Sequence, residues 1–484
     1  MKQKSLKLNA ILNIIKSLMG ILFPFISFPY ASRILLPEGI GKVNFANQTV
    51  ALFSIIAGLG IYTYALREAA KVRDNKEKLN QFCSEIFTTN IISTIFAYLL
   101  FFITIFTVPK YENYIPLLLI SSTTMFFKVF GLEWLYASQE DYIYITIRSI
   151  IFQILGIILL FLLVKNPDDY LKYCFISVIT SVGSNILNFF HSKHFVKIKI
   201  VNPKLIKKHI KKILILFAIV VSSSIYTILD TNMLGFFSND TEIGLYTAGI
   251  KVIRLSITAL AAISTVIVPR LSYMAENVSE IEYSNMLRKT LNAIEFLAIP
   301  AMFGLFILSE PIIIILCGKE YLKSIKISRI ISPIIFFILI GGAIGDQIFT
   351  PLRKDKLNFY PVVIGAFINI ILNSILIPKL GAIGAAIGTV IAEASVNILK
   401  YIFALPYIKG KHFFSEIWKY FISALVMAII LFFYQKFIQN QFTRLIGGIL
   451  IGIGTYLIVN IFLRTSVLKV LLESIKTKLH RRPK

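Results

Sequence analysis

The sequence predicts an all-α polytopic membrane protein with about 14 transmembrane helices: two parallel six-helix lobes around a central cavity, plus two C-terminal helices. Three observations lead to this fold class. The 484 residues are 56% hydrophobic and only 15% charged, where a soluble protein carries about 25% charged residues. Apolar stretches of about 20 residues recur along the whole chain, each long enough to cross the hydrocarbon core. Short sequence matches also indicate that the second half repeats the first.

Each apolar stretch must be a helix, because backbone groups inside hydrocarbon find no water to bind. Turn residues and charges at the flanks mark where each helix ends. We expect helices near 8–30, 44–66, 84–108, 114–137, 143–164, 170–191, 213–237, 243–269, 289–308, 324–351, 358–378, 382–405, 416–435 and 443–463. The first of these lacks a small-residue cleavage site, which favours a retained helix over a signal peptide.

Basic residues gather in the connectors on one side of the membrane. Connector 67–78 carries five cations and 191–212 carries eight, whereas 109–113, 238–242 and 379–381 carry one or none. The positive-inside rule puts the basic connectors, and both termini with them, in the cytoplasm. The net charge of +25 therefore fits a multi-pass membrane protein. It does not indicate nucleic-acid binding, since no exposed domain presents a basic face.

The internal repeat rests on matches that occur in the same order in both halves. The matched pairs are 40–46 with 243–249, 66–67 with 269–270, and 185–187 with 397–399. We expect an N-terminal six-helix lobe over 1–192, a basic cytoplasmic connector over 193–212 and a C-terminal six-helix lobe over 213–408. Helices 13 and 14 and a basic cytoplasmic tail then occupy 409–484. Two lobes of the same orientation favour alternating access around a central cavity.

Ionisable side chains inside a membrane are costly and usually face a cavity or a partner. Within the predicted helices they are Arg148, Asp230, Lys251, Arg254, Glu295, Asp346 and Glu393, with Arg33, Lys128 and Glu133 nearer helix ends. Lys251 and Arg254 are three residues apart, so they share one face of their helix.

Two interpretations of these charges stay open. In the first, Asp230 forms a structural ion pair with Lys251 or Arg254, and Glu133 pairs with Arg148. In the second, Arg148, Lys251 and Arg254, together with Arg33, line a cationic cavity that binds an anionic headgroup. Arginine suits a phosphate because its guanidinium can bond two oxygens at once.

Other chemistry finds little support in the sequence. Asp230 and Glu393 are candidates for coupling transport to a H⁺ or Na⁺ gradient. Phosphate-loop, HExxH and GxSxG motifs are missing, so we expect neither an enzyme nor a bound cofactor. The cysteines (Cys83, Cys174 and Cys317) are scattered, which favours apolar filling over metal ligation.

One segment carries a specific resemblance. Residues 133–142 read EWLYASQEDY and resemble the pattern EWLYQGxExY, with departures at Ala137, Ser138 and Asp141. Stretches 230–235 (DTNMLG) and 268–272 (VPRLS) follow in family order, as does the glycine run 381–388 with Glu393. On these motifs the chain resembles the multidrug/oligosaccharidyl-lipid/polysaccharide (MOP) exporter superfamily, and within it the Wzx-type (RfbX-like) flippases. Glu133, Trp134 and Glu140 are its motif residues.

The resemblance implies a substrate and a location. Such flippases move undecaprenyl-diphosphate-linked oligosaccharide repeat units from the cytoplasmic to the outer leaflet of the bacterial cytoplasmic (inner) membrane. The product serves O-antigen, capsule or another surface polysaccharide. The sugars enter a hydrophilic cavity while the lipid tail stays among membrane lipids. An ion gradient is expected to drive transport, and a polymerase of the same pathway is an expected partner.

Three alternatives belong to related or different classes. A MATE-type drug antiporter typically has twelve helices and an acidic cavity, whereas this chain has two more predicted helices and an excess of intramembrane cations. A lipid II flippase shares the helix number, but the 133–142 segment favours the oligosaccharide branch. A polysaccharide polymerase or ligase generally carries a large external loop, and none is expected here.

Overall fold

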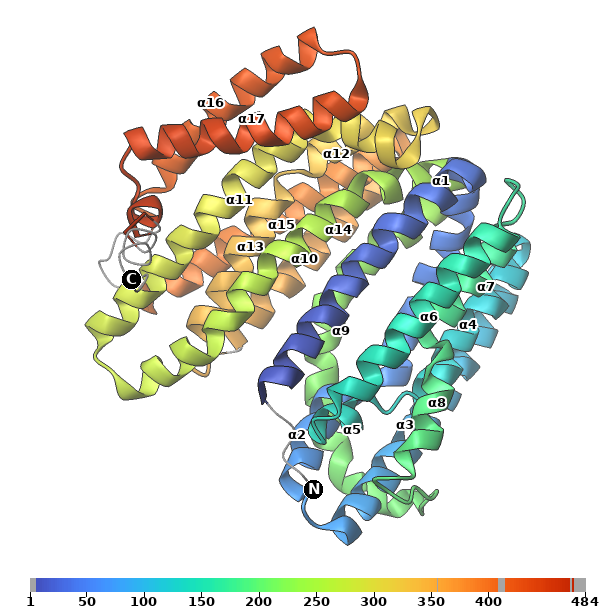
Figure 1. The fold of residues 1–484 in the computed structure, drawn as a ribbon. Helices are drawn as coiled ribbons and strands as arrows, with labels where there is room; N and C mark the ends of the chain where they lie inside the picture. Colours follow the sequence, from blue (N-terminus) through green and yellow to red (C-terminus); the bar gives the residue numbers. More distant parts are fainter. Residues whose placement is uncertain (1–5, 355, 408–413, 471, 474–484) are drawn as a thin grey trace, which may run out of the picture. The chain divides into compact units, whose positions relative to one another are not determined.

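The protein is helical throughout the part of the chain that the structure describes. The computed structural model covers residues 6–354, 356–407, 414–470 and 472–473, and it contains no strand within these ranges (Figure 1). The predicted all-α class is confirmed. The described residues divide into two compact units, the first ending at Gly244 and the second beginning at Leu245. The predicted connector 193–212 lies inside the first unit, and the predicted lobe boundaries stay a prediction.

The first unit contains the helices that precede Gly244 and the start of the next one. They are α1 (Leu6–Gly58), α2 (Ile61–Val72), α3 (Lys76–Thr107), η1 (Pro109–Tyr114), α4 (Ile115–Val129), α5 (Glu133–Ser138), α6 (Tyr142–Leu163), α7 (Tyr170–Val178), η2 (Ile179–Gly183), α8 (Asn185–Ser192), η3 (Pro203–Ile206), α9 (Lys207–Phe237) and the beginning of α10 (Asp240–Asn277).

The second unit contains the rest of α10 and the helices after it. They are α11 (Glu280–Cys317), η4 (Lys319–Tyr321), α12 (Leu322–Ile331), α13 (Ile334–Ile344), η5 (Gly345–Phe349), α14 (Lys356–Leu380), α15 (Ala382–Ala404), η6 (Leu405–Tyr407), α16 (Ile417–Phe437) and α17 (Gln441–Phe462).

Helix α1 is two helices joined at a bend. Leu36 takes φ 57° and ψ 176°, and Pro37 follows it. A proline disfavours helical geometry in the residue before it, and a positive φ at leucine is strained. A straight helix of 53 residues would be about 80 Å long. The hydrocarbon core of a membrane is only about 30 Å thick. The bend thus separates the helices predicted over 8–30 and 44–66.

The described part of the chain gives fewer membrane spans than the predicted 14, and part of the difference comes from how the spans are counted. In the described residues 11 helices are long and apolar enough to cross a membrane, or 12 if a pair bent by 41° between Ile331 and Ile334 is one span. This count takes Leu22–Val72 as a single segment, although α1 bends within it. It also leaves out α9, where a helix is predicted over 213–237. The total of about 14 stays a prediction.

Several predicted helices are interrupted. The helix predicted over 114–137 is split into α4 and α5, and Leu132 takes φ 45° in the break. The π-helical turn η2 interrupts the helix predicted over 170–191, and η5 ends the one predicted over 324–351. Apolar composition continues through each break, so hydropathy alone could not locate them.

The segments that begin the two sequence repeats touch each other within the first unit. A Cβ atom on Gly41 would overlap the backbone carbonyl of Asp240, and one on Gly244 would overlap that of Pro37. Pro37 precedes Gly41 by four residues, and Asp240 precedes Gly244 by four. The two contacts are therefore equivalent under the repeat. Only glycine permits backbones to approach this closely.

A second pair of equivalent contacts lies inside the separate units. Asn188 on α8 donates from Nδ2 to the carbonyl of Gly131 in the first unit. Lys400 on α15 donates from Nζ to the carbonyl of Gly341 in the second, at 3.2 Å. Each donor stands three residues after the asparagine of the matched Asn-Ile-Leu triplet. The repeat is therefore visible in side-chain contacts as well as in sequence.

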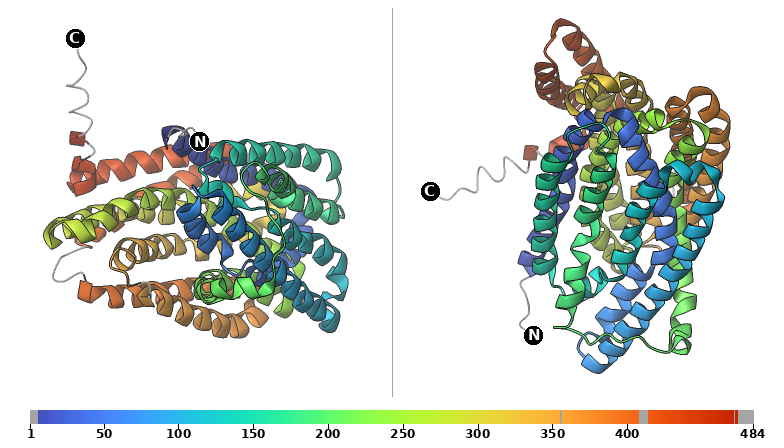
Figure 2. Two further views of the ribbon diagram at one scale, coloured as in Figure 1. Left: turned by 90° about the horizontal axis from the view of Figure 1, so that it is seen from below. Right: turned by 90° about the vertical axis from the view of Figure 1, so that its right-hand side faces the viewer.

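The chain between α8 and η3 is an extended strap along α3. Its alternate backbone N–H groups donate to side-chain oxygens one helical turn apart. These bonds are Lys197 N to Asn80 Oδ1 (2.8 Å), Lys199 N to Ser84 Oγ (3.0 Å) and Val201 N to Thr88 Oγ1 (3.1 Å). Four helical residues advance about 6 Å and two extended residues about 6.6 Å, so the two registers match. Figure 2 shows the green strap beside the blue start of α3.

A buried carboxylate fixes the start of α9 to the same helix. Glu85 on α3 is 1% exposed and accepts hydrogen bonds from Lys208 Nζ and His209 Nε2, both at 2.8 Å, and from Gln81 Nε2 at 3.0 Å. The other ring nitrogen of His209 lies 2.7 Å from the hydroxyl of Tyr64 on α2. A buried charge is tolerated when it is paired and hydrogen-bonded, as it is here.

Helices α16 and α17 form a hairpin that packs on α11 (Figure 1). Glu416, just before α16, accepts from the backbone N (2.9 Å) and the Oγ (2.6 Å) of Ser466 beyond α17. Burial alone would raise the pKa of Glu416, but the hydrogen bonds from Ser466 and the charge of Lys419 outweigh it and hold this pKa below its ordinary value. The two ends of the hairpin are thereby joined.

We expect Glu85→Gln to lower the stability of the purified protein by about 1–3 kcal/mol, because the hydrogen bonds from Lys208 and His209 lose the negative charge of their acceptor. A thermal melt followed by a thiol-reactive dye would measure this as a lower melting temperature. Glu77→Gln is the matched control, since Glu77 lies exposed on the first turn of the same helix. Equal melting temperatures for the two variants would contradict the assigned role of Glu85.

We also expect Gly41→Ala to destabilise the protein by about 1–3 kcal/mol, because the new methyl group meets backbone that cannot move aside cheaply. The same melting assay applies. Gly20→Ala, on the same helix with no atom within 4 Å of its added Cβ, should leave stability unchanged or slightly higher. A melting temperature of Gly41→Ala at or above that of Gly20→Ala would argue against the close contact.

Candidate functional site

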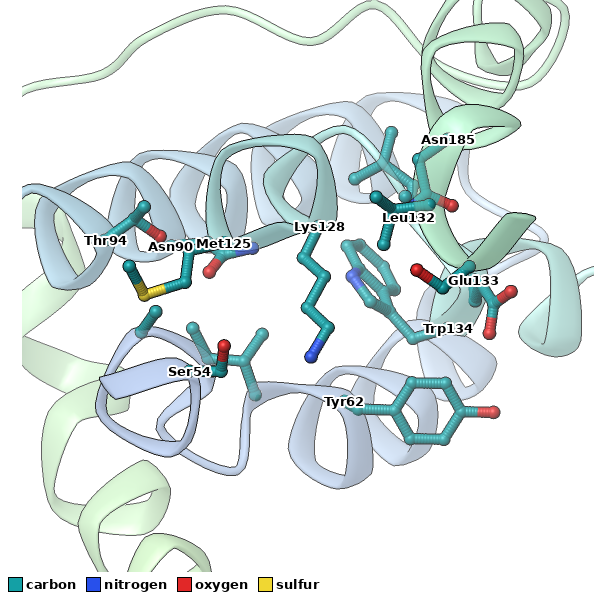
Figure 3. A pocket seen from close by; sticks show the side chains of 16 residues that line it. Ser54, Tyr62, Asn90, Thr94, Met125, Lys128, Leu132, Glu133, Trp134 and Asn185 are labelled. Atoms are coloured by element: carbon teal, nitrogen blue, oxygen red, sulfur yellow. The ribbon is translucent and has the colours of Figure 1, made fainter. Parts of the chain in front are cut away.

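A polar pocket of about 340 Å³ opens within the first unit (Figure 3). It lies between the end of α1 and the start of α2, the middle of α3, the break between α4 and α5, and the η2–α8 junction. Its lining side chains include Ser54, Tyr62, Asn90, Thr94, Met125, Lys128, Leu132, Glu133, Trp134 and Asn185. The volume is at the lower end of the range for pockets that bind small molecules. We refer to it as the polar pocket.

The break after α4 forms one wall of this pocket. Because Leu132 turns the chain with a positive φ, Glu133 and Trp134 begin a new short helix instead of continuing α4. The carbonyl of Gly131 that the break leaves outside a helix is bonded by Asn188. The first two residues of the resemblance motif, Glu133 and Trp134, therefore have a structural role as part of this wall.

Arg148 lies buried behind the wall and ties three elements together. Its NH1 donates to the carbonyl of Ser184 at 2.9 Å and lies 3.5 Å from Asn185 Oδ1, and its NH2 lies 3.3 Å from Glu133 Oε1. The side chain is 5% exposed. Pairing of Glu133 with Arg148 was one of the two interpretations of the sequence, and the structure contains that ion pair. A role for Arg148 in binding an anion stays a prediction.

Lys128 enters the same pocket from α4. Its side chain extends into the hollow, with Ser54 and Thr94 to one side and Tyr62 and Trp134 to the other (Figure 3). Unlike Arg148, it has no hydrogen-bond or ion-pair partner among the residues that the structure describes. On the sequence alone, Lys128 is placed near a helix end and is assigned no site role.

The rest of the motif packs the wall into the unit. Trp134 is 5% exposed and meets Phe82 of α3 edge-on, with ring centroids 6.1 Å apart. Tyr136 is fully buried and donates to the carbonyl of Asn188 at 2.6 Å. Glu140 instead forms an exposed ion pair with Arg73 at 2.9 Å, outside the pocket. Glu133 and Trp134 are thus brought together and Glu140 is not.

The other predicted site residues of the first unit lie elsewhere. Arg33 is exposed on α1, shortly before the bend at Leu36. Asp230 is fully buried on α9. Neither lines the polar pocket.

The remaining predicted residues belong to the second unit. Lys251 is partly buried and Arg254 exposed, both on α10. Glu393 is 4% exposed on α15. The predicted pair of Asp230 with Lys251 or Arg254 joins residues of different units and stays a prediction.

An apolar cavity of about 550 Å³ occurs in the second unit. It is bounded by α10, α11, α16 and α17. Its lining includes Leu260, Phe296, Pro300, Gly304, Met427, Leu431, Gly448 and Tyr456. Among the described residues, no group of three His, Cys, Asp or Glu side chains could hold a metal ion.

Some residues of the polar pocket could have been found from sequence. Asn90 and Thr94 are four apart and therefore share one face of α3, where polar side chains interrupt an apolar run. Lys128 near the end of the apolar segment 115–129 is a similar signal. Nothing local connects these positions with Ser54 or Asn185, which only the fold brings near.

Comparison with known proteins identifies a matching family and related proteins. Residues 6–275 match the family described as "Polysaccharide biosynthesis protein". The protein named "Putative O-antigen transporter" from Shigella dysenteriae is 24% identical over 377 residues, which cover 78% of this chain and 94% of that protein. The "Capsular polysaccharide biosynthesis protein CapF" of Staphylococcus aureus is 25% identical over 398 residues, covering 80% and 96%.

Solved structures share the fold. A lipid II flippase, MurJ, in an inward closed conformation superposes with a TM-score of 0.77 at 23% identity, covering 94% of this chain and 99% of that one. An inward-facing MATE-family multidrug transporter of the MOP superfamily superposes with a TM-score of 0.63 at 15% identity, covering 82% and 98%. The family match spans more than half of the sequence, and the chain therefore belongs to the polysaccharide biosynthesis protein family.

Proposed function

We propose that the chain is a flippase for lipid-linked oligosaccharides. It moves undecaprenyl-diphosphate-linked repeat units from the cytoplasmic to the outer leaflet by alternating access, for O-antigen, capsule or another surface polysaccharide. The observation that carries this proposal is the match along almost the whole length of relatives named for O-antigen transport and capsular polysaccharide biosynthesis. Under it the protein is a transporter and not an enzyme.

The diphosphate of such a substrate needs cations inside a protein that is otherwise apolar. Arg33, Lys251 and Arg254 are the exposed or partly exposed candidates, and Arg148 is a buried one. A charge-assisted hydrogen bond to a phosphate contributes about 1.5–3 kcal/mol, more than a neutral one. Guanidinium groups also match the geometry of phosphate oxygens.

The lipid part has different requirements. A polyprenyl chain is wholly apolar, so it gains nothing from the polar pocket and is compatible with the bilayer or with the apolar cavity of the second unit. Movement against a gradient requires coupling. Asp230 and Glu393, both buried carboxyl groups, are the candidates for a H⁺ or Na⁺ site.

The proposed location is the bacterial cytoplasmic (inner) membrane with both termini in the cytoplasm. The basic connectors support this orientation. The strap and the start of α9 then lie on the cytoplasmic side, where the lipid-linked substrate is assembled. A polymerase of the same pathway is the expected partner on the opposite side.

Lipid II flipping is the second candidate. The TM-score of 0.77 with a lipid II flippase favours it over drug export, although at 23% identity this likeness extends to the fold alone. Both candidates involve a diphosphate-linked polyprenyl lipid and differ in the sugar. Competition between the two lipids for transport separates them.

Purified protein in proteoliposomes tests the proposed function. The vesicles carry a labelled undecaprenyl-diphosphate oligosaccharide from the host, and a membrane-impermeant sugar-modifying enzyme reports how much label is accessible over time. We expect protein-dependent exchange between leaflets, with or without an imposed H⁺ or Na⁺ gradient. Absence of exchange under both conditions would refute the proposal, and exchange of lipid II alone would favour the second candidate.

We expect the double variant Lys251→Ala, Arg254→Ala to flip this substrate at least about tenfold more slowly, since it loses charge-assisted contacts to phosphate. Its melting temperature should stay close to that of the wild type, because both side chains are at least partly exposed. Lys326→Ala, an exposed lysine on α12 of the same unit, is the control. Unchanged flipping by the double variant would remove both residues from the site.

A further inference from the structure

The polar pocket holds more unsatisfied polar groups than a structural cavity needs. Ser54 on α1, Asn90 and Thr94 on α3 and Lys128 on α4 all line it. None of these side chains has a hydrogen-bond partner among the described residues, and the Thr94 hydroxyl is fully buried. A buried polar group is normally bonded, so the Thr94 hydroxyl calls for an explanation. Ser54 and Asn90 are partly exposed and Lys128 is exposed. Four unpartnered polar side chains around one hollow indicate a ligand that supplies the missing partners.

The charged lining residues Lys128 and Glu133, taken together with Arg148 behind the wall, carry one more positive than negative charge. Glu133 is the one acidic residue among the lining side chains, and its carboxylate is paired with Arg148 at 3.3 Å. The ammonium of Lys128 is then left over. A cation in a membrane protein is costly unless an anion or water compensates it. The pocket is therefore suited to an anionic group.

The opposite side of the pocket is aromatic. Trp134 and Tyr62 face Lys128 across the hollow (Figure 3). A sugar ring has flat C–H faces that pack on aromatic rings and hydroxyl groups that bond to amides and hydroxyls. Asn90, Ser54 and Thr94 supply such groups. Tyr62 is 51% exposed, so the pocket is open to entry.

We propose that the polar pocket binds one acidic sugar unit, with Lys128 on its phosphate or carboxylate, Tyr62 along its ring and the edge of Trp134 in the wall beside it. The site rests on the proposed function in that the sugar belongs to the transported oligosaccharide. It is separate from the cations Arg33, Lys251 and Arg254, none of which lines it. Thr94 follows the last strap contact, Thr88, by about 9 Å of helix, so the site at the middle of α3 lies next to the part of the helix that the strap covers.

The chain contains its own reporter, because Trp134 is one of two tryptophans. In a Trp418→Phe background, Trp134 becomes the only source of tryptophan emission. Purified full-length protein is titrated with glucose 1-phosphate, glucuronate, glucose and inorganic phosphate. We expect a saturable change with at least one acidic sugar, at concentrations at least about tenfold below those needed for glucose or phosphate. Which acid responds distinguishes a phosphate from a carboxylate source.

Variants assign the response to the pocket. Lys128→Met should raise the half-saturating concentration at least about tenfold, whereas Lys128→Arg keeps the charge and should change it much less. Lys165→Met, an exposed lysine beyond α6, is the matched control and should have no effect. Thr94→Val is a second test that does not depend on folding of the Lys128 variants. It removes an unpartnered hydroxyl, so it should weaken binding while keeping or raising the melting temperature.

Three results would overturn the proposal. They are no saturable response to either acidic sugar, a response that Lys128→Met leaves unchanged, and a response to inorganic phosphate as strong as that to the acidic sugars. The flipping assay distinguishes failure of the proposed sugar site from failure of the proposed flippase function. Flipping by the wild type without a Trp134 response removes the sugar site alone. A Lys128-dependent Trp134 response without flipping removes the flippase function and keeps the site.

Discussion

The structure depends on the rule that backbone N–H and C=O groups inside hydrocarbon must be bonded within the protein. Long helices satisfy this rule without help, so they carry no information about where a ligand binds. Places where a helix stops inside the membrane need compensation from side chains. Asn188 provides it at the break after α4, where it bonds the carbonyl of Gly131 from the neighbouring helix α8. The breaks and their compensating side chains therefore determine where polar chemistry can exist.

The polar pocket illustrates this dependence. A continuous helix through 130–132 would carry Glu133 and Trp134 onward along the α4 axis, whereas the break starts α5 there. The break in turn requires Asn188 and Tyr136, which join α5 and the preceding loop to α8. Arg148 then locks Glu133 to the start of α8 through Ser184. The break before α5, the hydrogen bonds of Asn188 and Tyr136, and the Arg148–Glu133 ion pair therefore form one arrangement. Lys128 is the charged side chain that has no partner in this arrangement.

Features that depend on composition and on the local periodicity of the sequence could be predicted from it. Features that depend on contacts between residues far apart in the chain could not. The helical class, the apolar segments and the pairing of Glu133 with Arg148 followed from hydropathy and position along the chain. The bend at Leu36, the break at Leu132 and the polar pocket did not, because apolar composition runs through the breaks and the pocket joins residues from Ser54 to Asn185. The side chains of Ser54, Asn90 and Thr94 are individually ordinary for a membrane helix. Their shared feature, the lack of a partner, exists only in three dimensions.

The strap along α3 has a consequence for how this region can vary. Its three bonds use backbone N–H groups of Lys197, Lys199 and Val201, so those positions can exchange side chains without losing a bond. The acceptors on α3 have no such latitude. Inserting or deleting one residue between 197 and 201 would move the next N–H to the opposite side of the extended chain and uncouple the remaining bonds. Natural variants are therefore expected to differ here in residue identity and to keep the length of the segment.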